Sequence, residues 1–173
     1  ESTATYDGTT LELTTSGGGL KLDGLASSNA NTLDDYEEGT WTPVLTAVTS
    51  GTITLNSGWN TGGYVKVGRM VTVFGQFYVD SVSSPVGLLY LGGLPFTTLS
   101  MTAHAEETVS HLNFSALATS DLDVCVWINN SGAATCTGYG TNNKATGGYQ
   151  TTYIAPYIQG SASFGVCISY PAA

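Results

Sequence analysis

The chain has 173 residues, a net charge of −9 from four basic and thirteen acidic residues, and only 10% charged residues in all. Its length suffices for one compact domain with a sizeable core. The charge argues against nucleic acid and against anionic lipid, since both require basic side chains, and no apolar run approaches the roughly 20 residues that span a bilayer.

Residues 1–30 contain a short internal echo. Leu11-Glu12-Leu13 is followed by Leu20-Lys21-Leu22, with a Gly-rich spacer between the two pieces. Each piece alternates apolar and polar residues, which is the period of a β-strand. Two such short units cannot bury a face alone. An extended β-shaft held by partner chains and a flexible linker therefore both stay open for this segment.

Residues 31–43 form an acidic stretch that we interpret as a joint between shaft and head. The stretch has no basic residue and four carboxylates, at Asp34, Asp35, Glu37 and Glu38. Glycoside hydrolysis needs two carboxylates that face each other about 5–10 Å apart, whereas these residues are adjacent in the chain. The loop pattern of calcium sites is also absent. We therefore predict a joint and not an active site.

From Trp41 onward, short apolar runs alternate with turn residues at the spacing of a β-sandwich. Ala103–Glu107 could instead be a short helix. The fold class predicted is all-β, with a jelly-roll-like antiparallel β-sandwich head over residues 44–173. The expected strands are Trp41–Thr49, Thr52–Leu55, Tyr64–Val67, Met70–Asp80, Gly87–Leu91, Met101–Glu107, Val109–Ala118, Asp121–Asn129, Ala133–Thr137, Thr151–Tyr157 and Ser163–Tyr170.

The strand Met70–Asp80 has two apolar faces. Val71, Val73, Phe77 and Val79 share one face, and Met70, Phe74 and Tyr78 share the other. A strand with two apolar faces is typical of the centre of a sheet that is covered on both sides. We predict that a second sheet covers one face and that another subunit could cover the other. Ser83-Ser84-Pro85 is expected to end the strand.

The three cysteines, Cys125, Cys136 and Cys167, are an odd number and form no C-x-x-C motif. This pattern does not indicate a disulfide framework. If Asn130-Ser131 is a two-residue hairpin loop, Cys125 lies opposite Cys136, whereas a three-residue loop shifts the register by one position. We predict neighbouring but reduced thiols.

Motifs for catalysis or metal binding are missing. The two histidines, His104 and His111, and the nearby Glu106 form no zinc motif. No nucleophile elbow, phosphate-binding glycine loop or H-E-x-x-H sequence occurs. We therefore assign no catalytic residue, no metal and no cofactor, and we predict that the protein is not an enzyme.

Two predicted loops carry side chains suited to sugar binding, which uses aromatic rings for stacking and amides for hydrogen bonds. Adaptable recognition loops are rich in the same residues. The alternative is that these aromatic rings pack at loop bases or in a subunit interface. The candidate ligand-binding residues are Trp59 and Asn60 on one loop, and Tyr139, Asn142, Asn143, Tyr149 and Tyr153 around the other, which spans Tyr139–Gln150.

Four elements resemble those of bacteriophage tail-fibre and tailspike proteins, in which such sequences introduce a C-terminal β-structured head. The first is Asn-Thr-Leu-Asp-Asp-Tyr-Glu-Glu-Gly-Thr-Trp-Thr-Pro at residues 31–43. The second, at 63–73, is similar to a Tyr-x-Lys-x-Gly-x-x-Val-x-Val element, and Gly93-Leu94-Pro95-Phe96 matches a turn of the family. The closing strand Phe164–Tyr170 sits where the family's last strand does. The resemblance covers residues 31–173 but is weak from 97 to 162, where one candidate loop lies.

The resemblance implies a homotrimer in the virion, assembled in the host cytoplasm with other appendage proteins, with a thin shaft before a globular head. Its head would bind host-surface carbohydrate without cleaving it. A purely structural module for trimerisation and virion stability is the alternative, and a depolymerase is a third. Three copies of the joint would gather acidic groups around one axis, which is costly when they are buried. We therefore expect its carboxylates to point outward, cap backbone amides or share a cation, while Leu33, Tyr36 and Trp41 turn inward.

Overall fold

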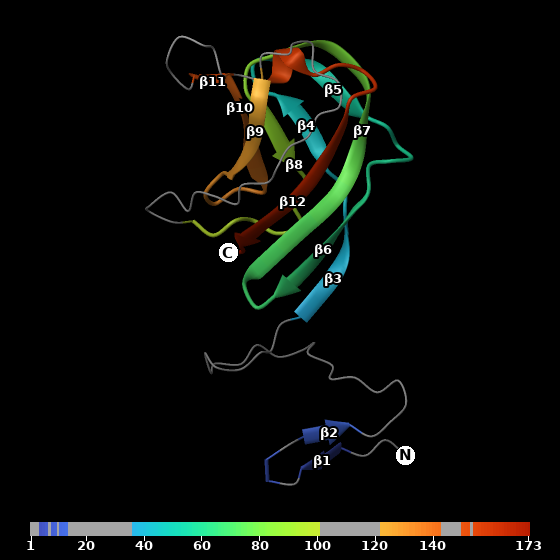
Figure 1. Ribbon diagram of the computed structural model, residues 1–173, viewed down its shortest axis with the longest axis vertical. Coiled ribbons are helices and arrows are strands. Elements are labelled where there is room, and N and C mark those ends of the chain that lie inside the picture. The colour runs from blue at the N-terminus through green and yellow to red at the C-terminus, as the bar shows by residue number, and fades with distance from the viewer. Residues whose placement is uncertain are drawn as a thin grey trace.

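The computed structural model describes residues 4–6, 8–9, 11–13, 36–100, 122–142, 150–152 and 154–173. Within these ranges the chain is antiparallel β-structure, with one short 3₁₀-helix at Ala155–Tyr157 (Figure 1). The predicted all-β class is thus confirmed. No helix in this part of the chain is long and apolar enough to cross a membrane.

Two antiparallel sheets make up the folded part of the chain from Tyr36 onward, which is called the head below and includes residues 36–41 of the predicted joint. One has the order β12-β7-β6-β3, and β5 pairs with the C-terminal half of β7. The other has the order β11-β10-β8-β4, and β9 also pairs with β10. The first sheet is built from β3 (Tyr36–Trp41), β5 (Ser50–Leu55), β6 (Gly62–Val67), β7 (Met70–Val86) and β12 (Ser163–Pro171), and the second from β4 (Val44–Ala47), β8 (Leu89–Gly92), β9 (Leu122–Asn129), β10 (Thr135–Asn142) and β11 (Gln150–Thr152).

Near the N-terminus, β1 (Ala4–Tyr6) pairs with β2 (Leu11–Leu13) as a small hairpin of its own. The first copy of the sequence echo is therefore a strand, and it pairs within the same chain. The second copy, at residues 20–22, lies outside the described residues.

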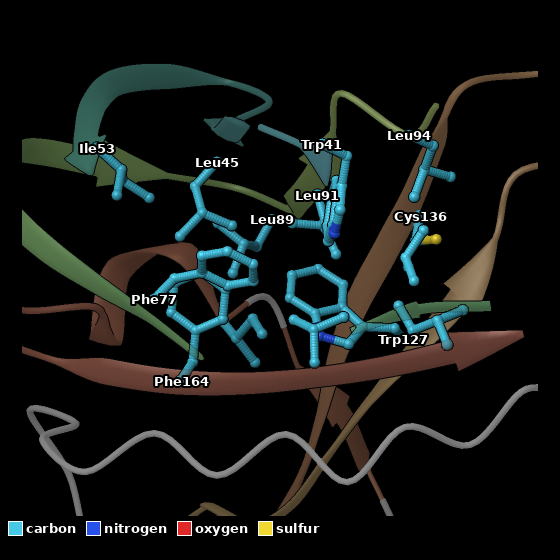
Figure 2. Close-up of a cluster of buried hydrophobic side chains, with 14 of the residues drawn as sticks. Trp41, Leu45, Ile53, Phe77, Leu89, Leu91, Leu94, Trp127, Cys136 and Phe164 are labelled. Carbon is cyan, nitrogen blue, oxygen red and sulfur yellow. The ribbon is translucent and has the colours of Figure 1, made fainter. Parts of the chain in front are cut away.

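The core of the head lies between the two sheets. In the first sheet the buried side chains alternate along β7 as predicted, with Val71, Val73, Phe77 and Val79 pointing inward. They join Leu89 and other residues of the second sheet in one buried cluster (Figure 2). The predicted central position of this strand is also confirmed, because β7 pairs with β12 on one side and with β6 on the other.

Part of the acidic stretch is a strand of the first sheet. Tyr36–Trp41 is strand β3, which pairs with β6 along its whole length. The predicted single strand Trp41–Thr49 is wrong, because the chain leaves the first sheet at Thr42-Pro43 and enters the second as β4. Proline has no N–H for a sheet ladder, which suits this crossover. Trp41 is buried at the C-terminal end of β3 and packs edge-on against Phe77, with ring centroids 5.6 Å apart.

Strand β7 is longer than predicted. Ser83-Ser84-Pro85 does not end it, since the strand continues to Val86 and pairs with β5 there. Ser84 adopts a positive φ of 41°, and the register between β5 and β7 shifts twice. Such bulges bend a strand without ending it, so turn-type residues here produce curvature instead of a break.

The hairpin between β9 and β10 corrects the predicted position of the cysteines. Asn129 lies opposite Cys136, and Asn130 N–H donates to the carbonyl of Thr135, so the loop is longer than two or three residues. Cys125 pairs with Gly140 and not with Cys136. Cys136 is buried, Cys167 is exposed, and neither forms a disulfide.

Two further predictions fail at the C-terminal side. Tyr139 to Asn142 belong to β10 and not to a loop, because they continue its ladder with β9 and begin one with β11. The predicted strand Thr151–Tyr157 ends at Thr152, and Ala155–Tyr157 is a 3₁₀-helix with proline in its first turn. Ser163–Tyr170 is confirmed as strand β12. The predicted strands at 101–118 lie outside the described residues.

Candidate functional site: a hollow beside Trp59

A hollow of about 420 Å³ opens at the point along β7 where its pairing with β12 ends on one edge and its pairing with β5 begins on the other edge. This volume lies within the usual range of small-molecule sites, about 300–1,000 Å³. Three segments build it: the turn after β5, the middle of β7 and the turn before β12. The lining residues are Asn56, Trp59, Tyr78, Val79, Asp80 and Ser161.

The turn after β5 holds Trp59 in place. Asn56 N–H donates to the carbonyl of Tyr78, which joins the turn to β7. The side-chain oxygen of Asn56 then accepts from Gly58 N–H at 2.9 Å, and its carbonyl accepts from Trp59 N–H at 3.0 Å. Asparagine favours turns because its side chain can bond backbone groups two residues on. The turn is therefore ordered by its own hydrogen bonds.

Trp59 is the most exposed large hydrophobic residue of the described chain, at 61%. One edge of its ring system meets Tyr78, with centroids 5.4 Å apart and planes inclined at 66°. Edge-to-face aromatic contacts contribute about 0.5–1.5 kcal/mol. Tyr78 thus supports the indole, while most of the indole surface stays open to solvent. This is the geometry of a stacking platform.

The opposite wall is made of backbone. Val79 N–H donates to the carbonyl of Ala162, and Ser161 N–H donates to the carbonyl of Val79, both at 2.8 Å. Ser161 adopts a φ of 67°, in the left-handed region that non-glycine residues seldom occupy. These hydrogen bonds hold the strained turn against β7 and place the exposed Ser161 at the rim of the hollow.

The polar groups around the hollow are a carboxylate, an amide and two hydroxyls, from Asp80, Asn56, Tyr78 and Ser161. Among the described lining residues, Asp80 supplies the only carboxylate and no side chain is basic. Lys66 and Arg69 belong to the other end of the sheet, since Lys66 pairs with Val71 while Tyr78 pairs with Ser163. A flat apolar ligand face with several hydroxyl groups and no negative charge fits this arrangement.

The candidate binding residues were predicted on two separate loops, and those that the structure describes lie in different parts of it. Trp59 lines the hollow, whereas Asn60 is half-buried and is not one of its lining residues. Tyr139 and Asn142 are in β10 of the other sheet, on the opposite side of the head from the β5–β6 turn in Figure 1. Asn143, Tyr149 and Tyr153 lie outside the described residues.

The sequence pointed to Trp59 but to none of the five other lining residues, which are Asn56, Tyr78, Val79, Asp80 and Ser161. Asn56 was within reach, because an asparagine followed by Ser-Gly just before Trp59 is a turn signal. Tyr78 and Asp80 share the outward face of β7, but nothing in their spacing connects them to Trp59. Ser161 lies about 100 residues further along the chain and is brought in only by the pairing of β12 with β7.

The joint is organised by tyrosines. Tyr36 donates to Glu38 at 2.9 Å, and Tyr64 donates to Glu37 at 2.5 Å. These hydrogen bonds raise the pKa of both tyrosines, and burial and the carboxylate charge add smaller effects. The carboxylates of Glu37 and Glu38 are exposed and bond to tyrosine hydroxyls; the arrangements expected were that they point outward, cap backbone amides or share a cation.

The residues of the joint that were expected to turn inward are Leu33, Tyr36 and Trp41, and the two that the structure describes differ in exposure. Trp41 is buried as predicted. Tyr36 does not turn into the core of this chain, since it lies on the outward side of β3 and is 45% exposed. Leu33, Asp34 and Asp35 fall outside the described residues, as do His104, Glu106 and His111. Within the described part of the chain, no group of three or more His, Cys, Asp or Glu side chains could hold a metal ion.

Comparison with known proteins places the fold. No protein-family description matches the chain, and no curated protein matches it. Among solved structures, the crystal structure of Dettilon tailspike protein (gp208) matches with a TM-score of 0.62 and 24% sequence identity. The match covers 79% of this chain and 24% of that one, so this chain spans about a quarter of the length of its structural neighbour. The all-β head of this chain therefore shares its fold with part of a tailspike protein.

Proposed function

We propose that this chain is the head region of a bacteriophage tail fibre or tailspike, a homotrimeric virion appendage whose head binds host-surface carbohydrate. In this proposal, residues 1–30 are shaft, residues 31–43 are the joint, and residues 44–173 are a jelly-roll-like head. The fold likeness to a tailspike protein supports the appendage assignment. The appendage assignment rests equally on the sequence elements of the joint and the strands that resemble this class of protein.

The observation that carries carbohydrate binding is the exposed indole of Trp59 beside a hollow lined with polar groups. Sugars have apolar faces that stack on aromatic rings and hydroxyls that bond amides and carboxylates. An indole held open by Tyr78 offers the first contact, and Asn56, Asp80 and Ser161 offer the second. Three copies of a weak site would raise the overall affinity through avidity.

We propose binding without cleavage. Hydrolysis of glycosides uses a pair of carboxyl groups on either side of the scissile bond. Among the described residues that line the hollow, Asp80 supplies the only carboxyl group. A sugar held against Trp59 would therefore meet one carboxylate, which can accept hydrogen bonds from its hydroxyls but has no second acid with which to share catalysis.

A purely structural role in the virion is the second candidate. It is favoured by the apolar side chains that β3, β6 and β7 leave exposed on one face, at Tyr36, Val67, Met70 and Phe74. Such a face suits assembly with other chains better than it suits binding of sugars. A head that serves only trimerisation and virion stability would keep this face and would not need the hollow.

The test is to incubate the purified chain with surface polysaccharide from candidate host bacteria and to measure both binding and release of reducing ends. We expect saturable binding and no released product. Binding with release of product would establish a depolymerase. Absence of binding to every host polysaccharide, together with no competition against phage adsorption, would leave the structural role.

A further inference from the structure

The outward face of the β12-β7-β6-β3 sheet is apolar and unpartnered in the single chain. Met70 is 52% exposed, Phe74 and Tyr36 are 45% exposed, and Val67 is 42% exposed. The register places them together, since Tyr36 pairs with Val67, Val67 pairs with Met70, and Phe74 lies four residues along β7 from Met70. Half of the eight large hydrophobic side chains exposed in the described chain therefore gather on one face.

This face carries almost no charge. Between the large side chains lie small or neutral residues, which are Gly63, Val65, Thr72, Gly165, Cys167 and Ser169. Thr72 and Ser169 bond each other at 2.8 Å, so their hydroxyls are satisfied within the sheet. Glu38 is the one outward carboxylate in the paired region, and it accepts from Tyr36 at the edge strand. In a chain of net charge −9, this is where two copies can approach with little repulsion.

The size of the face is close to that of the smallest specific protein interfaces. Strands β12, β6 and β3 contribute nine, six and six residues. With the paired half of β7, at about 3.3 Å per residue and 4.8 Å between strands, the flat projection is about 500 Å². Specific interfaces start near 600 Å² per partner, and protruding side chains such as Phe74 bring the accessible area close to that value.

We infer that this face is the surface through which copies of the chain pack against one another, with Phe74 near its middle and Met70 at the end next to the β6–β7 turn. The inference rests on the proposed oligomer and adds the surface that forms it. It can be tested apart from sugar binding, because Met70 and Phe74 do not line the hollow, although Tyr78, which supports Trp59, lies on the same outward face of β7.

Cys167 is a natural probe of the face. It is exposed in the single chain and pairs across the sheet with Phe74. Cleavage after Lys144 leaves Cys167 as the only thiol of the C-terminal peptide, so its labelling by a maleimide can be followed by mass spectrometry without any substitution. In the assembled 173-residue protein we expect labelling at least about tenfold slower than in a dissociated variant, since a covered thiol must first be uncovered.

Met70→Glu is the dissociating variant, because it places like charges in the contact. Val44→Glu is its matched control: Val44 is also 52% exposed, and it lies in the other sheet. Light scattering should give a mass of several chains for the wild type and Val44→Glu and a lower mass for Met70→Glu, with Cys167 labelled fast only in the last. Phe74→Glu is a second variant should Met70→Glu fail to fold.

Three outcomes would overturn the inference. An oligomer in which Cys167 labels fast places the contact on another surface and leaves the proposed trimer standing. A monomer in which Cys167 labels slowly means that another part of the same chain covers the face. A monomer with fast labelling removes both the surface and the trimer, while sugar binding at Trp59 can still be measured separately.

Discussion

The hydroxyl of Tyr64 donates a 2.5 Å hydrogen bond to Oε1 of Glu37, and this bond connects strand β3 of the acidic joint to its neighbour β6. The ring of Tyr64 lies over Gly39, where an added Cβ would come within 2.8 Å of it. It also meets the edge of Phe96, with centroids 5.6 Å apart, and Lys66 Nζ lies 5.4 Å from the centre of the Phe96 ring. The joint is therefore fastened to the head by an aromatic cluster.

The first prediction concerns the ionisation of Tyr64. The bond to Glu37 holds the pKa of Tyr64 above its ordinary value of 10.0, so the contribution of this bond to stability is present below pH 10 and is lost as the pH rises through the folded pKa. In the Glu37→Gln variant the pKa of Tyr64 should fall. Ultraviolet difference titration against a Tyr64→Phe blank measures it, and an unchanged titration would show that the bond does not form in solution.

The second prediction concerns the close approach at Gly62. An added Cβ there would lie 2.5 Å from Nε1 of Trp41 and 2.6 Å from the carbonyl of Phe74, the two groups that bond each other at 3.4 Å. Gly62→Ala should therefore destabilise the head by about 1–3 kcal/mol, as overpacking does. Gly92→Ala is the control, because its Cβ would meet neighbours only at 3.6 Å or more. Equal denaturant midpoints for the two variants would contradict this packing.

The third prediction concerns alkaline stability. Burial raises the pKa of the Cys136 thiol from 9.0 to about 12. The unfolded chain then releases this proton first, so the free energy of unfolding should fall by about 1.4 kcal/mol per pH unit between about 9 and 12. Burial also raises the pKa of Tyr170, which adds to the slope above pH 10.

Cys136→Ala separates the two groups. It lowers stability at neutral pH through the lost side chain, but it should flatten the decline between pH 9 and 10, before Tyr170 contributes. Urea unfolding at several pH values measures this. A slope that is the same in both proteins would mean that Cys136 is more accessible to water than its burial indicates.

The fourth prediction concerns the charge of the bound sugar. Asp80 is the one charged group lining the described hollow. A ligand carboxylate about 4 Å from it would be repelled by about 1 kcal/mol in water, which is about fivefold in affinity. Asp80→Asn should therefore improve binding of acidic polysaccharide relative to neutral polysaccharide. If the variant loses both to the same extent, Asp80 serves as a hydrogen-bond acceptor and does not select by charge.

The sequence was informative where one pattern dominated. The alternation of Val71, Val73, Phe77 and Val79 predicts the buried face of β7, and the structure has it, because burying these side chains outweighs other local preferences. The prediction that Ser83-Ser84-Pro85 ends the strand was wrong for a physical reason. Turn residues also form bulges when a partner strand continues alongside, and β5 does so here.

The candidate site was only partly visible in the sequence. Trp59 stood out as an aromatic residue in a turn. The residues around Trp59 come from β7 and from the turn before β12. These two segments are about 80 residues apart in the chain, and only antiparallel pairing brings them together. The prediction that Tyr139 and Asn142 lie in a loop was wrong because those residues continue β10, where pairing with β9 outweighs the turn preference of the Gly-rich sequence.

The most direct test of the account is the affinity of Trp59 variants for host polysaccharide, measured by surface plasmon resonance. Covering about 60 Å² of the exposed indole is worth about 1.5 kcal/mol, so Trp59→Ala should weaken each site about tenfold. Trp59→Phe should retain much of the binding because it keeps an aromatic ring, and Val44→Ala, an exposed residue outside the hollow, should bind like the wild type. Equal binding by Trp59→Ala and the wild type would contradict the proposed site.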